Sequence, residues 1–133
     1  MVDASRLSGM SFFAQLDPGD VEQIAAKATE SDAAVGDHLA TEGDFGYALY
    51  AIESGTADVT SDGALLRTLG PGDVFGEIAV LASGRRTASV TATSPMQLIS
   101  LFKRDVWALE RDCPGVAERL RALIAERQAA AAS

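Results

Sequence analysis

The feature that most constrains this chain is a series of turn signals that recurs through its middle, between residues 33 and 102. Each signal combines a glycine or proline with a turn-forming neighbour: Gly36-Asp37, Gly43-Asp44, Ser54-Gly55, Asp62-Gly63, Pro71-Gly72-Asp73 and Ser94-Pro95. Between them lie short apolar or alternating runs: Tyr47–Ile52, Thr56–Thr60, Leu65–Leu69, Ala88–Thr93 and Leu98–Phe102. Asp62-Gly63 is a dipeptide typical of a two-residue β-hairpin. Many short strands at this spacing predict a β-sandwich or jelly roll.

Helical patterns flank this central region on both sides. Met10 to Thr29 reads as helical, with a helix start at Asp17-Pro18 and Phe12 and Phe13 anchoring it. After the strands, one short helix is expected over Asp105 to Asp112 and a second from Pro114. The second carries an apolar stripe of Val116, Leu120, Leu123 and Ile124, and its Ala-rich end past Arg127 is expected to fray. The 133 residues therefore predict one domain, helical over 1–30, β over 33–102 and helical over 104–131.

Charge and composition exclude several classes of protein. With 19 acidic and 11 basic residues the formal net charge is −8, which disfavours a general basic surface for nucleic acid or anionic membranes. No apolar run approaches the roughly 20 residues that span a bilayer. Cys113 is the single cysteine and His38 the single histidine. They leave no basis for an internal disulfide, a thiolate or histidine metal cluster, or a cupin-type metalloenzyme. A Ser-His-Asp hydrolase would have only His38 to use, and no nucleophile elbow lies near it, so we expect a non-catalytic, metal-free cytoplasmic protein.

One segment, from Phe75 to Val90, carries the residues that suit a phosphate-bearing ligand. Gly76 permits a positive φ or a close backbone approach. The residues from Glu77 to Leu81 can form one or two helical turns, whose first N–H groups would bind an anion. Arg86 adds a permanent planar cation, and Thr87 adds a hydroxyl and an amide. A carboxylate, a helix start and an arginine this close together suit a ligand with both hydroxyls and a phosphate.

This segment resembles the phosphate-binding cassette of the cyclic nucleotide-binding domain family. The family pattern is Phe-Gly-Glu-(apolar)-Ala-(apolar)-(apolar), a short loop, and Arg-(Ala/Ser/Thr)-Ala-(Ser/Thr)-Val, and every fixed position is filled here. The stretch from Gly36 to Val59 is similar to the family's glycine-punctuated early strands. From Val59 to Arg127 the chain registers without a gap on domains of hyperpolarisation-activated cation channels, and bacterial channel domains look similar too. The resemblance implies an eight-stranded jelly roll, or β-roll, with N-terminal helices and C-terminal hinge and lid helices.

The resemblance also implies a role for individual residues. Arg86 would bind the exocyclic phosphate oxygens of cAMP or cGMP, and Glu77 would accept the ribose 2′-hydroxyl. Backbone N–H groups of the cassette would hold phosphate and sugar: Gly76, Ile78, Ala79 and Thr87. Val59 and Leu69 fall where the family lines the base, and Arg127 falls where channel-type domains close a C-terminal arginine over it. The stripe on the last helix would then cover the bound base together with Val59 and Leu69.

Plainer interpretations stand beside these. Glu77 and Arg86 could form only a surface salt bridge, Arg85 is expected to face solvent, and Cys113 to be a packed small residue. Trp107 is expected in the core or on the lid surface. A receptor of this kind needs a protein or domain that responds to ligand binding, either an unidentified effector protein or another domain of a parent protein. The competing interpretation is an orphan interaction module of the same fold with an empty or differently filled pocket.

Overall fold

A computed structural model describes residues 2–43, 46–76, 86 and 88–132 of the chain. Eight strands and five helices lie within these residues. The N-terminal helices are α1 (Ser5–Ser8), α2 (Ser11–Ala14) and α3 (Pro18–Lys27). The strands follow as β1 (Thr29–Ala33), β2 (His38–Ala40), β3 (Ala48–Ser54), β4 (Ala57–Ser61), β5 (Ala64–Leu69), β6 (Val74–Phe75), β7 (Ser89–Ala92) and β8 (Met96–Phe102). Helices α4 (Lys103–Asp112) and α5 (Pro114–Ala132) complete the chain.

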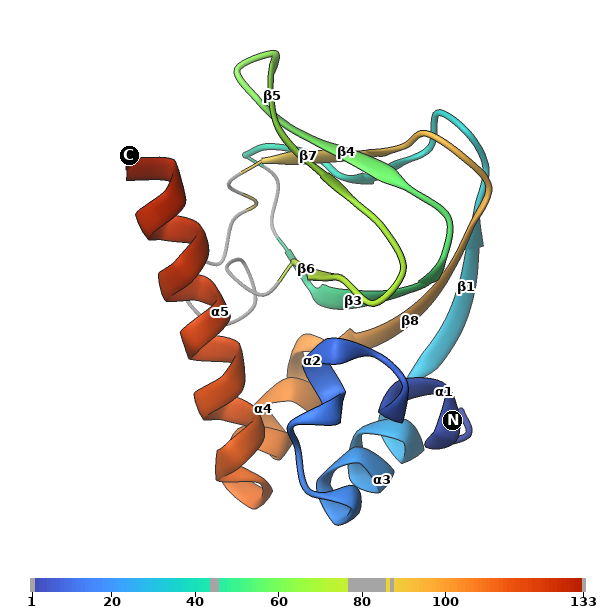
Figure 1. Cartoon of the computed structure of the whole chain (residues 1–133), viewed down its shortest axis with the longest axis vertical. Helices are drawn as coiled ribbons and strands as arrows, with labels where there is room; N and C mark the ends of the chain where they lie inside the picture. Colours follow the sequence, from blue (N-terminus) through green and yellow to red (C-terminus); the bar gives the residue numbers. More distant parts are fainter. Residues whose placement is uncertain (1, 44–45, 77–85, 87, 133) are drawn as a thin grey trace.

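The strands form two antiparallel sheets of four strands each, which confirms the predicted β-roll. One sheet has the order β1-β8-β3-β6 and the other β2-β7-β4-β5. Figure 1 shows the second sheet above the first, with the helices below and to one side. Apolar side chains fill the space between the sheets, and we call this group the inner core. Its buried members are Ala33, Ala40, Ile52, Ala57, Val59, Leu69, Phe75, Val90, Ala92, Met96 and Leu98.

The predicted hairpin at Asp62-Gly63 joins β4 to β5. Ser61 pairs with Ala64 across it, and Asp62 and Gly63 adopt φ values of 51° and 78°. Positive φ at both central residues is the geometry whose twist matches that of antiparallel strands. Asn, Asp and Gly tolerate this conformation best, so the local sequence accounts for the turn.

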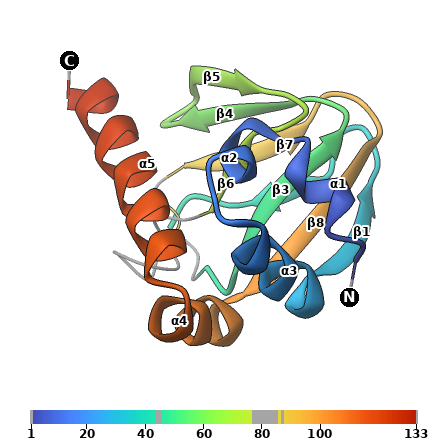
Figure 2. The ribbon, with the colours of Figure 1, turned by 60° about the horizontal axis from the view of Figure 1, so that its bottom comes forward.

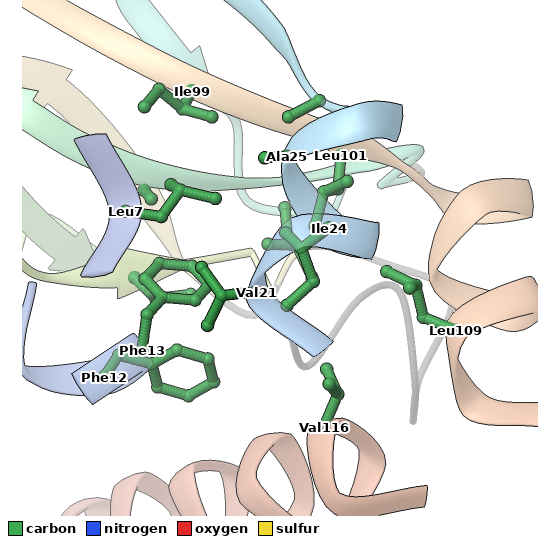
Figure 3. Close-up of a cluster of buried hydrophobic side chains, with 14 of the residues drawn as sticks. Leu7, Phe12, Phe13, Val21, Ile24, Ala25, Ile99, Leu101, Leu109 and Val116 are labelled. Atoms are coloured by element: carbon green, nitrogen blue, oxygen red, sulfur yellow. The ribbon is translucent and has the colours of Figure 1, made fainter. Parts of the chain in front are cut away.

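The helices pack on the other face of the first sheet and form a second cluster, which we call the helical core. Figure 3 shows Phe12 and Phe13 beside Val21, with Ile99 and Leu101 of β8 across from the helices. The two phenyl rings meet edge to face, with centroids 5.0 Å apart. Both are buried, which confirms that they anchor the N-terminal helices. Alternate side chains of β3 and β8 therefore enter different cores, as expected for strands buried on both faces.

Helix α5 leaves α4 at a break centred on Cys113 and runs along one side of the β-roll, as Figure 2 shows. Its first apolar residues, Val116 and Leu120, are buried in the helical core, and Leu123 packs against the same cluster. The guanidinium carbon of Arg119 lies 5.2 Å from the centroid of the Phe12 ring. The expectation that this stripe covers Val59 and Leu69 is therefore wrong for Val116 and Leu120, because these two residues belong to the helical core whereas Val59 and Leu69 belong to the inner core.

Three boundaries differ from the prediction. The N-terminal helical region ends at Lys27, and Thr29–Ala33 forms β1 by pairing with β8, so the β-roll begins earlier than residue 33. Helix α4 begins at Lys103, two residues before the start expected at Asp105, and α5 continues to Ala132, one residue beyond the helical end expected at 131. Trp107 is 55% exposed, so it lies on the surface of α4 and not in a core. No helix in the described parts of the chain is long and apolar enough to cross a membrane.

Candidate functional site

Gly76 and Arg86 are in direct contact, at the point where strand β6 ends. Gly76 has a φ of +90°, a conformation that side chains with a Cβ rarely adopt. A Cβ added here would lie 2.5 Å from Nη1 of Arg86 and 2.8 Å from the carbonyl oxygen of Ala48. Two independent reasons, the backbone angle and the close approach, thus require glycine. The sequence predicted a positive φ or a close backbone approach at Gly76, and the structure shows both.

Two backbone carbonyls orient the guanidinium of Arg86. Its Nη2 donates to the oxygen of Ala48 at 2.8 Å, and its Nη1 donates to the oxygen of Gly76 at 3.3 Å. The carbonyl of Arg86 itself accepts a hydrogen bond from the N–H of Gly43 at 2.9 Å. The predicted turn at Gly43 is therefore tied to the backbone that carries the arginine. Side chain and main chain of Arg86 are both held, which limits the rotamers open to a long side chain.

A stacked pair of aromatic rings lies beneath Arg86. Its guanidinium carbon is 6.0 Å from the centroid of the Tyr50 ring. That ring is stacked on Phe75, with centroids 5.0 Å apart and planes 25° apart. Phe75 in turn belongs to the inner core. The arginine is thus connected to the inner core through two rings, at a distance where a cation still gains from an aromatic face.

Val59 and Leu69, the predicted base contacts, lie in that same inner core. They come from the neighbouring strands β4 and β5, and both are almost completely buried. Phe75 belongs to this cluster as well, so the two residues and the ring that leads to Arg86 are members of one packed group. Whether they touch a base stays a prediction, but their place on the β-roll interior agrees with an apolar surface.

A pocket of about 300 Å³ opens beside Arg86. Its walls are the start of β3 and its preceding residue, strand β2 with the residue after it, and the end of β8: His38, Leu39, Ala40, Thr41, Tyr47, Ala48, Tyr50, Arg86 and Phe102. This volume is near the lower end of the usual range for small-ligand sites, about 300–1,000 Å³. A positively charged group at the edge of such a space suits a small anion.

Several predicted residues lie outside the described part of the chain. These are Glu77, Ile78, Ala79, Arg85 and Thr87. Their roles, and a possible salt bridge between Glu77 and Arg86, stay predictions. Arg127 lies in α5, and the structure describes only its backbone.

The remaining candidate groups have structural roles. His38 is exposed and its Nδ1 lies 3.1 Å from the hydroxyl of Thr91. Cys113 is buried, and burial raises the pKa of its thiol, so it stays protonated as the predicted packed residue. No cluster of three potential metal-ligating side chains occurs among the described residues.

Ala48 and Tyr50 are the site residues that the sequence did not single out. Ala48 acts through its carbonyl oxygen, which no side-chain pattern reports. Tyr50 lies in the predicted strand run Tyr47–Ile52, but only the fold places its ring beneath Arg86.

Comparison with known proteins agrees with this geometry. The family model described as cyclic nucleotide-binding domain matches residues 32–112. The cyclic AMP receptor protein of Thermus thermophilus is 44% identical over 91 residues, which are 65% of this chain and 42% of that protein. A cyclic nucleotide-gated cation channel protein of Drosophila melanogaster is 33% identical over 121 residues, 85% of this chain and 18% of the channel protein.

A solved structure is similar as well, the regulatory domain of Toxoplasma gondii PKA with cAMP. It has a TM-score of 0.71 and 31% sequence identity, over 79% of this chain and 42% of that one. The chain thus spans less than half the length of each of these proteins. The matched segment includes both sheets of the β-roll except the first residues of β1, and the contact between Gly76 and Arg86. This chain belongs to the cyclic nucleotide-binding domain family.

Proposed function

We propose that this domain is a receptor for cAMP. The observation that carries the proposal is the position of Arg86, whose guanidinium is held by two carbonyl oxygens beside the Gly76 turn and a pocket. Relatives whose names refer to cAMP support this choice of nucleotide. The hydroxyl of Thr87 could reach the amino group of guanine, so cGMP is the alternative ligand to be titrated beside it.

In this proposal Arg86 binds the exocyclic oxygens of the cyclic phosphate. A phosphodiester carries one negative charge, and a charge-assisted hydrogen bond is about twice as strong as a neutral one. The phosphate therefore competes well with the carbonyl oxygens of Ala48 and Gly76 for the guanidinium N–H groups. Those carbonyls keep the side chain near its working position before the ligand arrives, which lowers the entropic cost of binding.

The other contacts follow the family pattern. Glu77 accepts the ribose 2′-hydroxyl, and backbone N–H groups of Gly76, Ile78, Ala79 and Thr87 bind sugar and phosphate. Val59 and Leu69 provide apolar surface for the base, and Arg127 on α5 closes over it. Because Glu77 would lose its partner, a 2′-deoxy ligand should bind much more weakly.

The output of the domain is a change at α5 that an effector protein, or another domain of a longer polypeptide, detects. The first turns of α5 are buried in the helical core, so they serve as the anchor and the later turns as the moving part. The domain binds and releases its ligand unchanged, and we assign it no catalytic step. A cytoplasmic location is consistent with a single, buried cysteine.

Isothermal titration with cAMP, cGMP, 2′-deoxy-cAMP and 5′-AMP tests the proposal. We expect cAMP to bind most tightly, and 2′-deoxy-cAMP and 5′-AMP to bind far more weakly. If none of the four binds to a chain that unfolds cooperatively, the proposal fails and the orphan interaction module is favoured. Equal binding of cAMP and 2′-deoxy-cAMP would show that Glu77 does not accept the 2′-hydroxyl, and the proposed phosphate site would be unaffected.

A further inference from the structure

Three of the large apolar side chains that remain exposed gather at one place, where β8 passes into α4. Tyr47 is 65% exposed, Phe102 46% and Trp107 55%. With Lys103 and Arg104 they line a second pocket of about 400 Å³. We call these five residues the aromatic-basic patch. It neighbours the Arg86 pocket, because Tyr47 and Phe102 line both.

A backbone hydrogen bond joins the two segments that carry the patch. The N–H of Lys103 donates to the carbonyl oxygen of Tyr47 at 2.7 Å, which fixes the residue before β3 to the start of α4. The Nζ atom of Lys103 lies 5.2 Å from the centroid of the Trp107 ring. The aromatic rings and the cations are therefore arranged together on one surface.

Three local preferences are violated at this point. Lys103 and Arg104 put two cations in the first turn of α4, where the helix dipole favours anions, and Asp105 offsets one of them. Phe102 occupies the N-cap position, and no side chain there caps the helix. Large aromatic side chains face water although their burial would be favourable. Such departures from local rules are expected where a surface serves a partner.

The positive charge of the patch is not paired with a carboxylate of the described residues. The salt bridges of this region join Arg111 to Asp112 and Arg121 to Glu110, and within the described part of the chain neither Lys103 nor Arg104 takes part in one. The chain as a whole carries a charge of −8. A partner attracted to the patch must therefore be complementary to a local basic site on an otherwise acidic molecule.

We propose that the aromatic-basic patch binds an acidic peptide segment of a partner protein that inserts an apolar side chain between the aromatic rings. Trp, Tyr and Arg are the residue types that most often supply binding energy at protein interfaces. A second copy of the chain is disfavoured, since a symmetric contact would bring the cations of both patches together. An anionic lipid surface is disfavoured because an extended membrane faces the −8 charge of the whole chain, whereas a short acidic segment faces only the patch. This inference does not depend on which nucleotide binds.

The fluorescence of Trp107 provides a direct test, because the sequence contains a single tryptophan. Random short peptides are selected by display on the ligand-free chain, synthesised without tryptophan, and titrated while Trp107 emission is followed. We expect selected peptides to contain an apolar residue flanked by acidic residues. Arg104→Glu should weaken their binding about tenfold or more, because it places like charges together.

Matched controls separate the patch from general effects. Lys27→Glu reverses the charge of an exposed lysine on α3 and should leave the affinity unchanged. Phe102→Ser should weaken binding, whereas Leu66→Ser, at a comparably exposed apolar side chain on β5, should not.

Four outcomes would overturn the proposal. The first is selected peptides without acidic residues, and the second is binding that survives both Arg104→Glu and Phe102→Ser. The third is self-association that Arg104→Glu abolishes, which would assign the patch to a second copy. The fourth is a Trp107 emission shift with phosphatidylserine vesicles but with none of the selected peptides, which would assign it to a membrane. All arms use the chain without nucleotide, so a failure here is distinguishable from failure to bind cAMP.

Discussion

The Nη2 atom of Arg86 lies 2.8 Å from the carbonyl oxygen of Ala48, two positions before the Tyr50 ring that its guanidinium faces. Strand β3 thus supplies both an acceptor that orients the arginine and the aromatic surface beneath it. Because both features belong to one strand of the β-roll, the position of the guanidinium is fixed by the fold.

Arg86→Ala should weaken cAMP binding by about 2–5 kcal/mol, which is roughly 30-fold or more, because a partly buried phosphate charge would lose its partner. Arg86→Lys keeps the charge but loses the planar fork, so its affinity should be intermediate. Isothermal titration measures both variants, and urea unfolding checks that they are folded. Titration curves equal to those of the original chain would remove Arg86 from the site.

Gly76→Ala should reduce stability and nucleotide affinity together. The new Cβ would lie too close to the carbonyl oxygen of Ala48 and to Nη1 of Arg86. Alanine would also have to adopt the φ of +90° that Gly76 has. Gly63→Ala is the matched control, since Gly63 has a φ of +78° with no atom within 4 Å of the added Cβ. Urea unfolding should show Gly76→Ala to cost about 1–3 kcal/mol more than the control, the usual cost of overpacking. Equal losses in both variants would mean that the close approach is relieved by a small shift.

Glu53 should make stability depend on pH in the acidic range. Arg6 donates to both carboxylate oxygens of Glu53, at 2.7 and 2.6 Å, and this lowers the pKa of Glu53 below its ordinary value of 4.5. Because the pKa is lower in the folded state, the stabilisation is complete above about pH 4.5 and is lost as the pH falls through the folded value. Glu53→Gln should flatten this part of the curve of unfolding free energy against pH. Glu22→Gln, at an exposed position on α3, serves as the control and should not change the curve.

Ligand should protect the two halves of α5 to different extents in amide hydrogen exchange. Val116, Ala117, Leu120 and Ile124 are buried in the structure, so exchange in this part of α5 should be slow in both states. The residues beyond Ile124 and the cassette should exchange more slowly only after cAMP is added. If cAMP does not change amide exchange anywhere along α5, this helix takes no part in the response to ligand.

Much of the fold could be predicted from the sequence where local chemistry decides the structure. The Asp62-Gly63 hairpin and the helix start at Pro18 follow from residues that strongly prefer those conformations. Strand β1 could not be predicted in this way, because four of its five residues are exposed and polar. Its pairing with β8, far away in the sequence, is what makes Thr29–Ala33 a strand.

The site, too, has residues that the sequence predicts and others that only the fold brings together. Gly76 and Arg86 could be named from the cassette pattern, since their chemistry is in the residue type. The carbonyl of Ala48 could not, because every residue has one and only the fold brings this one to the arginine. The local sequence also does not determine which surface the apolar stripe of α5 packs against. An apolar stripe requires a surface, and both the β-roll and the N-terminal helices offer one.

Leu98 and Ile99 are adjacent in the chain, yet Leu98 belongs to the inner core and Ile99 to the helical core. A substitution at one of them therefore loosens one interior and leaves the packing of the other almost unchanged. The sheet β1-β8-β3-β6 is thus a wall that both interiors share, with one set of its side chains facing each. The two interiors can therefore accept substitutions separately, although a single sheet joins them.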